Sequence, residues 1–320
     1  MVSFGRSLRT AFALFVAAAF LGGCAAPQSR AIIAAPQDLP SAANVASVPF
    51  FPQERYHCGP ATIAMALAWS GLDVTSEQMV PEVYTPGREG TLPPDMVSAL
   101  RRHGRLAVPV GRLSEILTEI SAGHPVIVFQ NLGLTALPSW HFALAIGYDL
   151  EAGTISLHSG REAKRTIGLS TFERTWARAG AWALAVVRPG DLPTTGTAEK
   201  VARAAAGLER AGKAKAARDA YREMVMRWPD DLAAWIGRGN TSYALGDLAA
   251  AEDAFRLASA LHPSNAAAWN NLAHVLGERG RTAEAITAAR RAVKLAGDSD
   301  APYRETLDKL MRSGAASNGS

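Results

Sequence analysis

The stretch that decides the fold of the first half of this chain is QERYHCGPA, residues 53–61, with the apolar run TIAMALAW behind it. Proline is tolerated in the first turn of a helix, where its missing N–H would have no partner. The pattern therefore predicts a helix that starts near Gly59 and stops at Gly71. Cys58 then faces unpaired N–H groups and the positive end of the helix dipole, which favour the thiolate. This placement predicts that Cys58 is a nucleophile.

The other cysteine, Cys24, ends a secretory signal. Two arginines lie among the first nine residues, an apolar run occupies 11–21, and the letters LGGC follow at 21–24. A basic start, a short apolar core and small residues are typical of a secretory signal, and the run is short for a membrane span. LGGC resembles the lipobox of bacterial lipoproteins, whose cysteine is lipidated. The next residue is Ala25 and not aspartate, which by this resemblance favours the outer membrane of a Gram-negative bacterium.

Two alternatives to lipidation stay open for Cys24. The signal can be an ordinary one, or Cys24 can form a disulfide with Cys58, since exported proteins meet an oxidising compartment. If Cys24 carries a lipid, Cys58 is the lone thiol of an exported protein, which suggests a chemical role. We therefore expect a lipid-anchored protein of the cell envelope that faces the periplasm and contacts the membrane through its N-terminal lipid.

Composition divides the first part of the chain. We expect a lipoprotein signal peptide over 1–23, a flexible tether rich in Ala, Pro and Ser over 24–47, an α+β domain over 48–188 and a linker over 189–197. The α+β expectation rests on helices that precede strands. The helices are expected at Gly59–Trp69, Pro94–His103 and Arg112–Ala122, and the strands at Val126–Phe129, His141–Tyr148, Thr154–Leu157 and Ala181–Val187.

The remainder of the chain repeats with a period of 34 residues. The recurring positions are Trp235 and Trp269; Pro229 and Pro263; Gly212, Gly246 and Gly280; Ala217, Ala251 and Ala285; and Tyr221, Phe255 and Ala289. This period and these residue types resemble the tetratricopeptide repeat, a helix–turn–helix unit. We expect three repeats over 198–297, starting near Ala198, Leu232 and Ala266, then a capping helix and a disordered tail over 298–320. Such arrays form a groove that binds peptide or protein, or serve as spacers or dimerisation modules.

A thiol nucleophile needs a base, a group that orients the base, and donors for the oxyanion. Seven histidines are available. Five are poor candidates because they lie in the repeats, at a helix end, at a turn or directly beside the thiol: His262, His274, His103, His124 and His57. His141 and His158 remain. His141 is the stronger candidate because it opens an apolar strand.

The segment SWHFALAIGYD at 139–149, taken with the segment at 53–61, resembles papain-like cysteine peptidases of the bacteriocin-processing (double-glycine) type. The resemblance covers about 140 residues and implies a papain-like α+β fold. It also implies that Cys58 attacks the scissile carbonyl, and that His141 takes the thiol proton and later protonates the leaving amine. Gln53 would donate to the oxyanion together with the backbone N–H of Cys58.

The chain departs from this family after the histidine strand. Family members carry an Asp-Pro there, whose carboxylate orients the imidazole, whereas this chain has ISLHSG at 155–160. His158 or Ser159 occupies the place, and Ser159 could accept a hydrogen bond from His141. The nearest acid, Asp149, ends its strand in an expected turn. A weaker orienting group lowers activity without necessarily abolishing it.

Three functions fit these observations. The first is an exported thiol peptidase whose repeats bind a protein or peptide. The second is an inactive peptidase-like scaffold that assembles envelope proteins, which the missing aspartate favours. The third is a thiol acyltransferase or amidase. A net charge of +4 without a basic run and interleaved aromatics gives no reason to expect nucleic acid, and the chemistry requires no metal or cofactor.

Overall fold

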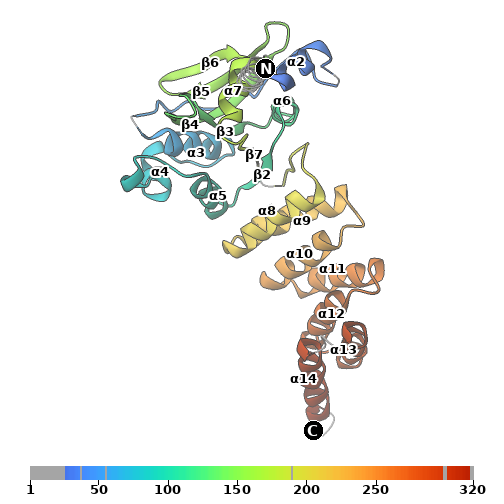
Figure 1. The fold of residues 1–320 in the computed structure, drawn as a ribbon. Coiled ribbons are helices and arrows are strands. Elements are labelled where there is room, and N and C mark those ends of the chain that lie inside the picture. Colours follow the sequence, from blue (N-terminus) through green and yellow to red (C-terminus); the bar gives the residue numbers. More distant parts are fainter. Residues whose placement is uncertain (1–25, 37, 55, 189, 298–300, 318–320) are drawn as a thin grey trace, which may run out of the picture. The chain divides into compact units, whose positions relative to one another are not determined.

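In the computed structural model of the chain, the structure describes residues 26–317 apart from 37, 55, 189 and 298–300 (Figure 1). The signal peptide and Cys24 lie outside the described residues. The rest forms two compact units. One contains the described residues up to Met96 together with Pro109–Val186, and the other contains Val97–Val108 together with the described residues from Val187 onward. Contacts thus group Val97–Val108 with the repeats, although we expected that segment in the first domain.

An antiparallel sheet forms most of the first unit. The strands are β1 (Ala42–Asn44), β2 (Leu106–Val110), β3 (Val126–Asn131), β4 (Trp140–Asp149), β5 (Thr154–Ser159), β6 (Glu162–Gly168) and β7 (Ala183–Val187). Their order is β2-β7-β3-β4-β5-β6, with β1 also paired to β4. β4 lies inside the sheet, and seven consecutive residues from Phe142 to Tyr148 are buried, which explains its unbroken apolar sequence. His141 opens this strand.

Helices accompany the sheet. They are α2 (Pro27–Ala34), α3 (Cys58–Trp69), α4 (Ser76–Val83), α5 (Pro93–Arg102), α6 (Leu113–Ser121) and α7 (Leu169–Ala177), with a short 3-10 turn at Pro86–Arg88. α6 and α7 bury Ile116 and Trp176 in one apolar cluster with Val128 of the sheet. α3 is apolar all round and is buried from Gly59 to Leu67, as expected of a helix inside a core. The predicted α+β class is confirmed.

The stretch expected to be a flexible tether is ordered where the structure describes it, and this part of the prediction is wrong. β1 pairs with β4, Ala43 opposite Tyr148. The buried carboxylate of Glu173, on α7, accepts hydrogen bonds from the backbone N–H groups of Gln28 (2.9 Å) and Ser29 (2.7 Å). These are orphan donors of the first turn of α2, and an acidic partner there stabilises the helix. The Ala-, Pro- and Ser-rich composition therefore did not predict α2, because the side chain that caps this helix lies 145 residues further along the chain.

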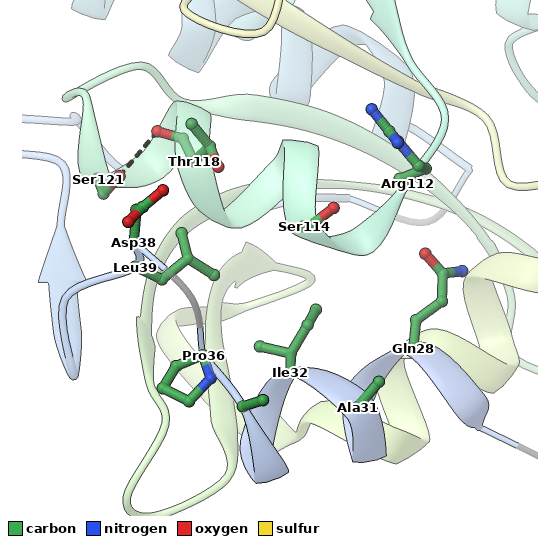
Figure 2. A pocket seen from close by; sticks show the side chains of 11 residues that line it. Gln28, Ala31, Ile32, Pro36, Asp38, Leu39, Arg112, Ser114, Thr118 and Ser121 are labelled. Atoms are coloured by element: carbon green, nitrogen blue, oxygen red, sulfur yellow. Dashed lines mark hydrogen bonds between the residues drawn. The ribbon is translucent and has the colours of Figure 1, made fainter.

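A pocket of about 640 Å³ separates α2 from α6. Figure 2 shows Gln28 and Ile32 of α2 facing Ser114 and Thr118 of α6 across it. The side-chain oxygen of Gln28 accepts a hydrogen bond of 2.8 Å from the backbone N–H of Leu113, which ties the two helices together at one end. None of the residues expected to be catalytic lines this pocket.

From Val187 onward, the second unit contains seven helices among the described residues. They are α8 (Ala198–Arg210), α9 (Ala214–Arg227), α10 (Leu232–Ala244), α11 (Leu248–Leu261), α12 (Ala266–Glu278), α13 (Thr282–Ala296) and α14 (Ala301–Ser317). The three helix pairs begin at the residues that the period predicts, and α14 follows them as the expected capping helix. Gly212, Gly246 and Gly280 end the first helices with φ of 71°, 80° and 76°, a conformation that glycine adopts without strain.

The 34-residue spacing of tryptophan and proline has a structural cause. The indole N–H of Trp235 donates to the carbonyl oxygen of Pro229 at 2.7 Å, and that of Trp269 donates to Pro263 at 3.1 Å. Each tryptophan thus fixes the turn that precedes its own helix pair. Within the described part of the chain, no helix is both long enough and apolar enough to span a bilayer.

Candidate active site

Cys58 is the first residue of α3, and His57 is the N-cap residue before it. The backbone N–H groups of Phe142 and Gly59 face the Cys58 thiol and act to lower its pKa. Because Phe142 directly follows His141 on β4, this contact brings the start of α3 to the start of the histidine strand. Cys58 is a free thiol in the described structure.

His141 and Ser159 meet in the structure. Nε2 of His141 lies 2.8 Å from the hydroxyl oxygen of Ser159, at the end of β5. Leu157 of β5 pairs with Arg165 of β6, and the pairing register of the two strands shifts between Leu157 and Ser159. Ser159 therefore lies where an orienting group is needed, and its hydroxyl leaves Nδ1 of His141 as the ring nitrogen that can serve as a base.

Gln53 is buried and joined to the same end of β5. Its side-chain oxygen accepts a hydrogen bond of 2.8 Å from the N–H of Gly160, and its backbone N–H donates to the Gly160 carbonyl at 2.9 Å. Its side-chain nitrogen contacts the hydroxyl of Thr62 on α3 at 3.4 Å. The second amide hydrogen has no acceptor among the described residues. Gln53 is thus fixed between α3 and β5, with one donor remaining for a ligand.

Burial controls the protonation of the two central groups. It raises the pKa of the Cys58 thiol above its usual range, and the N–H contacts offset this only in part. Burial, assisted by the charge of Arg165, lowers the pKa of His141 to about 4. The expectation that the helix start favours a thiolate in the free protein is therefore wrong, because desolvation outweighs it. At neutral pH the resting state contains a thiol and a neutral imidazole.

The other candidates have structural partners. His158 is buried; its Nε2 lies 3.3 Å from the carbonyl of Val48, and its Nδ1 accepts from the N–H of Lys164 at 3.2 Å. Asp149 accepts from the N–H of Ala152 in the turn after β4, as expected. His158 therefore anchors the segment before α3, and Ser159 is the residue of the two that reaches His141.

Sequence reasoning missed Thr91, which packs against α3. A Cβ atom on Gly59 would lie 2.2 Å from the Thr91 hydroxyl oxygen. That hydroxyl is buried and has no hydrogen-bond partner in the described structure. The glycine after Cys58 is therefore required by close approach of the loop before α5, and the sequence offered no signal that this loop reaches α3.

We expect Gly59→Ala to destabilise the protein by about 1–3 kcal/mol, because Thr91 must move to admit the methyl group. The loss is measured as a lower urea midpoint of unfolding. Gly111→Ala is the matched control, since no atom lies within 4 Å of the Cβ it would add. Equal midpoints for the two variants would contradict the close packing of Thr91 on Gly59.

Comparison with protein families agrees with this architecture. Residues 45–184 match the Peptidase_C39 like family, and residues 202–261 and 243–302 match the tetratricopeptide repeat. The chain therefore contains a C39-like peptidase domain followed by tetratricopeptide repeats, and the predicted fold class is confirmed.

Solved structures give more distant matches. A protein described as a C39-like peptidase from Bacillus anthracis is 17% identical, over 47% of this chain and 98% of its own, with a TM-score of 0.40. The type III secretion chaperone SycD of Yersinia enterocolitica, solved with a peptide of the translocator YopD, is 16% identical over 36% of this chain and 93% of its own, with a TM-score of 0.35. No curated protein matches the chain.

Proposed function

We propose that this protein is a thiol peptidase that hydrolyses peptide bonds with Cys58 as nucleophile and His141 as base. The observation that carries the proposal is the meeting of three elements. The thiol begins a buried helix, its neighbour across the site is the backbone N–H of Phe142, and the adjacent His141 is held by Ser159 at 2.8 Å. A nucleophile, a base and an orienting group are the parts that acyl transfer requires.

The neutral resting state suits this chemistry. Neutral His141 accepts the proton of the Cys58 thiol as the sulfur attacks the carbonyl carbon, so the charge forms only during reaction. The tetrahedral intermediate places its oxyanion near the donors of the helix start, with the free N–H of Gln53 as the proposed second donor. The intermediate collapses, the imidazolium gives its proton to the leaving amine, and an acyl thioester remains on Cys58.

Hydrolysis completes the cycle. His141 takes a proton from water, the resulting hydroxide attacks the thioester, and the carboxylic acid product leaves. The proton returns through the imidazole to the sulfur, which restores the starting thiol. An amine in place of water would make the same site an acyltransferase, and the assay below distinguishes that outcome by the mass of the product.

The repeats supply a second binding region, since tetratricopeptide repeats bind protein or peptide. We propose that they recruit the substrate or a partner to the peptidase domain. We propose peptide-bond hydrolysis without a requirement for a double glycine before the scissile bond.

The decisive experiment exposes the intact protein to a degenerate decapeptide library and reads new termini by mass spectrometry. Cleavage that a thiol-blocking reagent removes supports the peptidase. If an added amine is present and the new fragment ends in an amide of that amine and not in a carboxylate, the result supports acyl transfer. An absence of both products in folded protein would refute catalysis and favour the scaffold, which the neutral serine in place of a carboxylate also favours.

We further propose that Cys24 anchors the protein to the outer membrane, facing the periplasm. The basis is the LGGC segment behind a basic and apolar leader. Cys24→Ser is expected to move the protein from the membrane fraction to the soluble periplasmic fraction, because the thiol that carries the lipid is gone. Fractionation compares the variant with Cys58→Ser, which keeps Cys24. Membrane association that survives Cys24→Ser would rule out this anchor.

A further inference from the structure

The loop between β3 and β4 exposes large apolar side chains. Leu134 and Leu137 are 70% and 75% exposed, Trp140 is 53% exposed and Leu132 is 45% exposed. Single exposed apolar residues are ordinary, but a contiguous group indicates a surface that binds something. We call these four residues the apolar loop surface.

The loop is held in shape by its own polar groups. The side-chain oxygen of Asn131 accepts from the N–H groups of Gly133 (3.0 Å) and Ser139 (2.9 Å), and its nitrogen donates to the carbonyl of Leu134 at 3.3 Å. A guanidinium N–H of Arg178 donates to the Asn131 carbonyl at 3.0 Å. The Asn131 side chain therefore joins the two ends of the loop, and the leucines remain exposed to solvent.

The apolar loop surface ends at the strand that carries His141, because Trp140 is the first residue of β4. Trp140 stacks on Phe129 with ring centroids 5.3 Å apart and planes 15° from parallel, so its ring is fixed at the rim of the sheet. The next residue is His141, and the one after it, Phe142, offers its N–H to the Cys58 thiol. The rings of Trp140 and Phe142 both contact Phe129, with centroids 5.3 Å and 4.5 Å apart, so the exposed indole lies beside the residue whose N–H faces the nucleophile.

We propose that the apolar loop surface selects the substrate by receiving apolar side chains of the polypeptide close to the scissile bond. This inference rests on the proposed peptidase function. An extended chain advances about 3.3 Å per residue, so a peptide whose carbonyl lies at Cys58 carries side chains past this rim within a few residues. A preformed surface binds with little ordering cost. The substrate class is therefore a peptide segment rich in Leu, Ile, Val or Phe.

The test uses the full protein and two degenerate decapeptide libraries with a varied centre. The positions around the centre are apolar residues in one library and Ser, Gln or Thr in the other. We expect wild-type kcat/KM to be about 10- to 100-fold higher on the apolar library, the discrimination that apolar contacts supply. Leu134→Ser with Leu137→Ser should erase most of that preference by raising KM for the apolar library. Iodoacetamide labelling of Cys58 should be unchanged.

The matched control replaces Ile33, an apolar residue that is 47% exposed on α2, by serine, and should keep the preference. Cleavage whose preference survives in the loop variant overturns this proposal and leaves the peptidase intact. If the loop variant keeps its preference but no longer binds phosphatidylcholine–phosphatidylglycerol vesicles, the surface contacts a membrane instead. If it keeps its preference but loses a dimer that wild type forms in sedimentation, the surface contacts a second copy of the chain. Cleavage of neither library by wild type refutes the peptidase and this proposal together.

Discussion

Replacing Cys58 with alanine is expected to lower kcat/KM for peptide cleavage by about 10⁴-fold or more, the loss typical of removing a covalent nucleophile. Cys58 is the free thiol at the start of α3, and the proposed acyl thioester forms on its sulfur. The measurement is steady-state cleavage of a peptide chosen from the library.

Cys58→Ser is the companion variant, since it retains the size and polarity of the side chain. It should be as inactive as Cys58→Ala, because the hydroxyl of serine is a far weaker nucleophile without a strong base. Far-ultraviolet circular dichroism and the urea midpoint should match wild type for both. Activity within tenfold of wild type in either folded variant would place the nucleophile elsewhere and end the peptidase proposal.

The protonation states of the site add a pH dependence to this prediction. The pKa of His141 is lowered to about 4, so the base is deprotonated and ready at any pH above that value. We therefore expect kcat/KM to fall on the acid side only as the pH approaches 4. Labelling of Cys58 by iodoacetamide should rise only at a pH above the usual thiol range, because burial raises the thiol pKa.

Local sequence patterns predicted the elements whose cause is local. α3 begins at Cys58 because proline, glycine and an apolar run specify a buried helix start, and the repeat helices begin at Ala198, Leu232 and Ala266 because their period is written in the sequence. The helix α2 was missed because its cap is Glu173, far along the chain. β6 was missed because its residues are nearly all exposed and carry no apolar alternation.

The site shows the same division between local and distant causes. Motif spacing brought Cys58 and His141 together as candidates, but it could not choose between His158 and Ser159, since a register shift after Leu157 decides which of them reaches the imidazole. The sequence also could not predict the raised pKa of the Cys58 thiol, because desolvation depends on how tightly the whole domain covers α3. Sequence patterns identify the chemical groups, and tertiary packing determines their protonation states.

His141→Ala is expected to lower kcat/KM by about 10³- to 10⁴-fold, because no neutral base then accepts the thiol proton. The informative comparison is with Ser159, whose hydroxyl is the partner of Nε2. Ser159→Ala removes one neutral hydrogen bond, worth about 0.5–1.5 kcal/mol, so activity should fall only about 2- to 13-fold. The ratio of the two losses separates the base from the residue that orients it.

Ser159→Asp tests the orienting role in the opposite direction. A carboxylate beside Nε2 stabilises the imidazolium and raises the pKa of His141, so we expect the acid limb of kcat/KM to move to a pH above 4. The imidazolium that forms during attack is stabilised as well, and kcat/KM at neutral pH should rise by about tenfold, part of what a triad carboxylate supplies. The His141 pKa is measured by NMR titration of the ring carbons.

Ser159→Asn is the matched control, because its side chain is similar in size to aspartate and carries no charge. It should leave the acid limb near pH 4 and give no gain. If Ser159→Asp folds normally, as judged by its urea midpoint, and leaves the His141 pKa unchanged, then Ser159 does not face the base in solution. In that case the catalytic unit consists of Cys58 and His141 alone, and the hydroxyl contact at 2.8 Å has only a structural role.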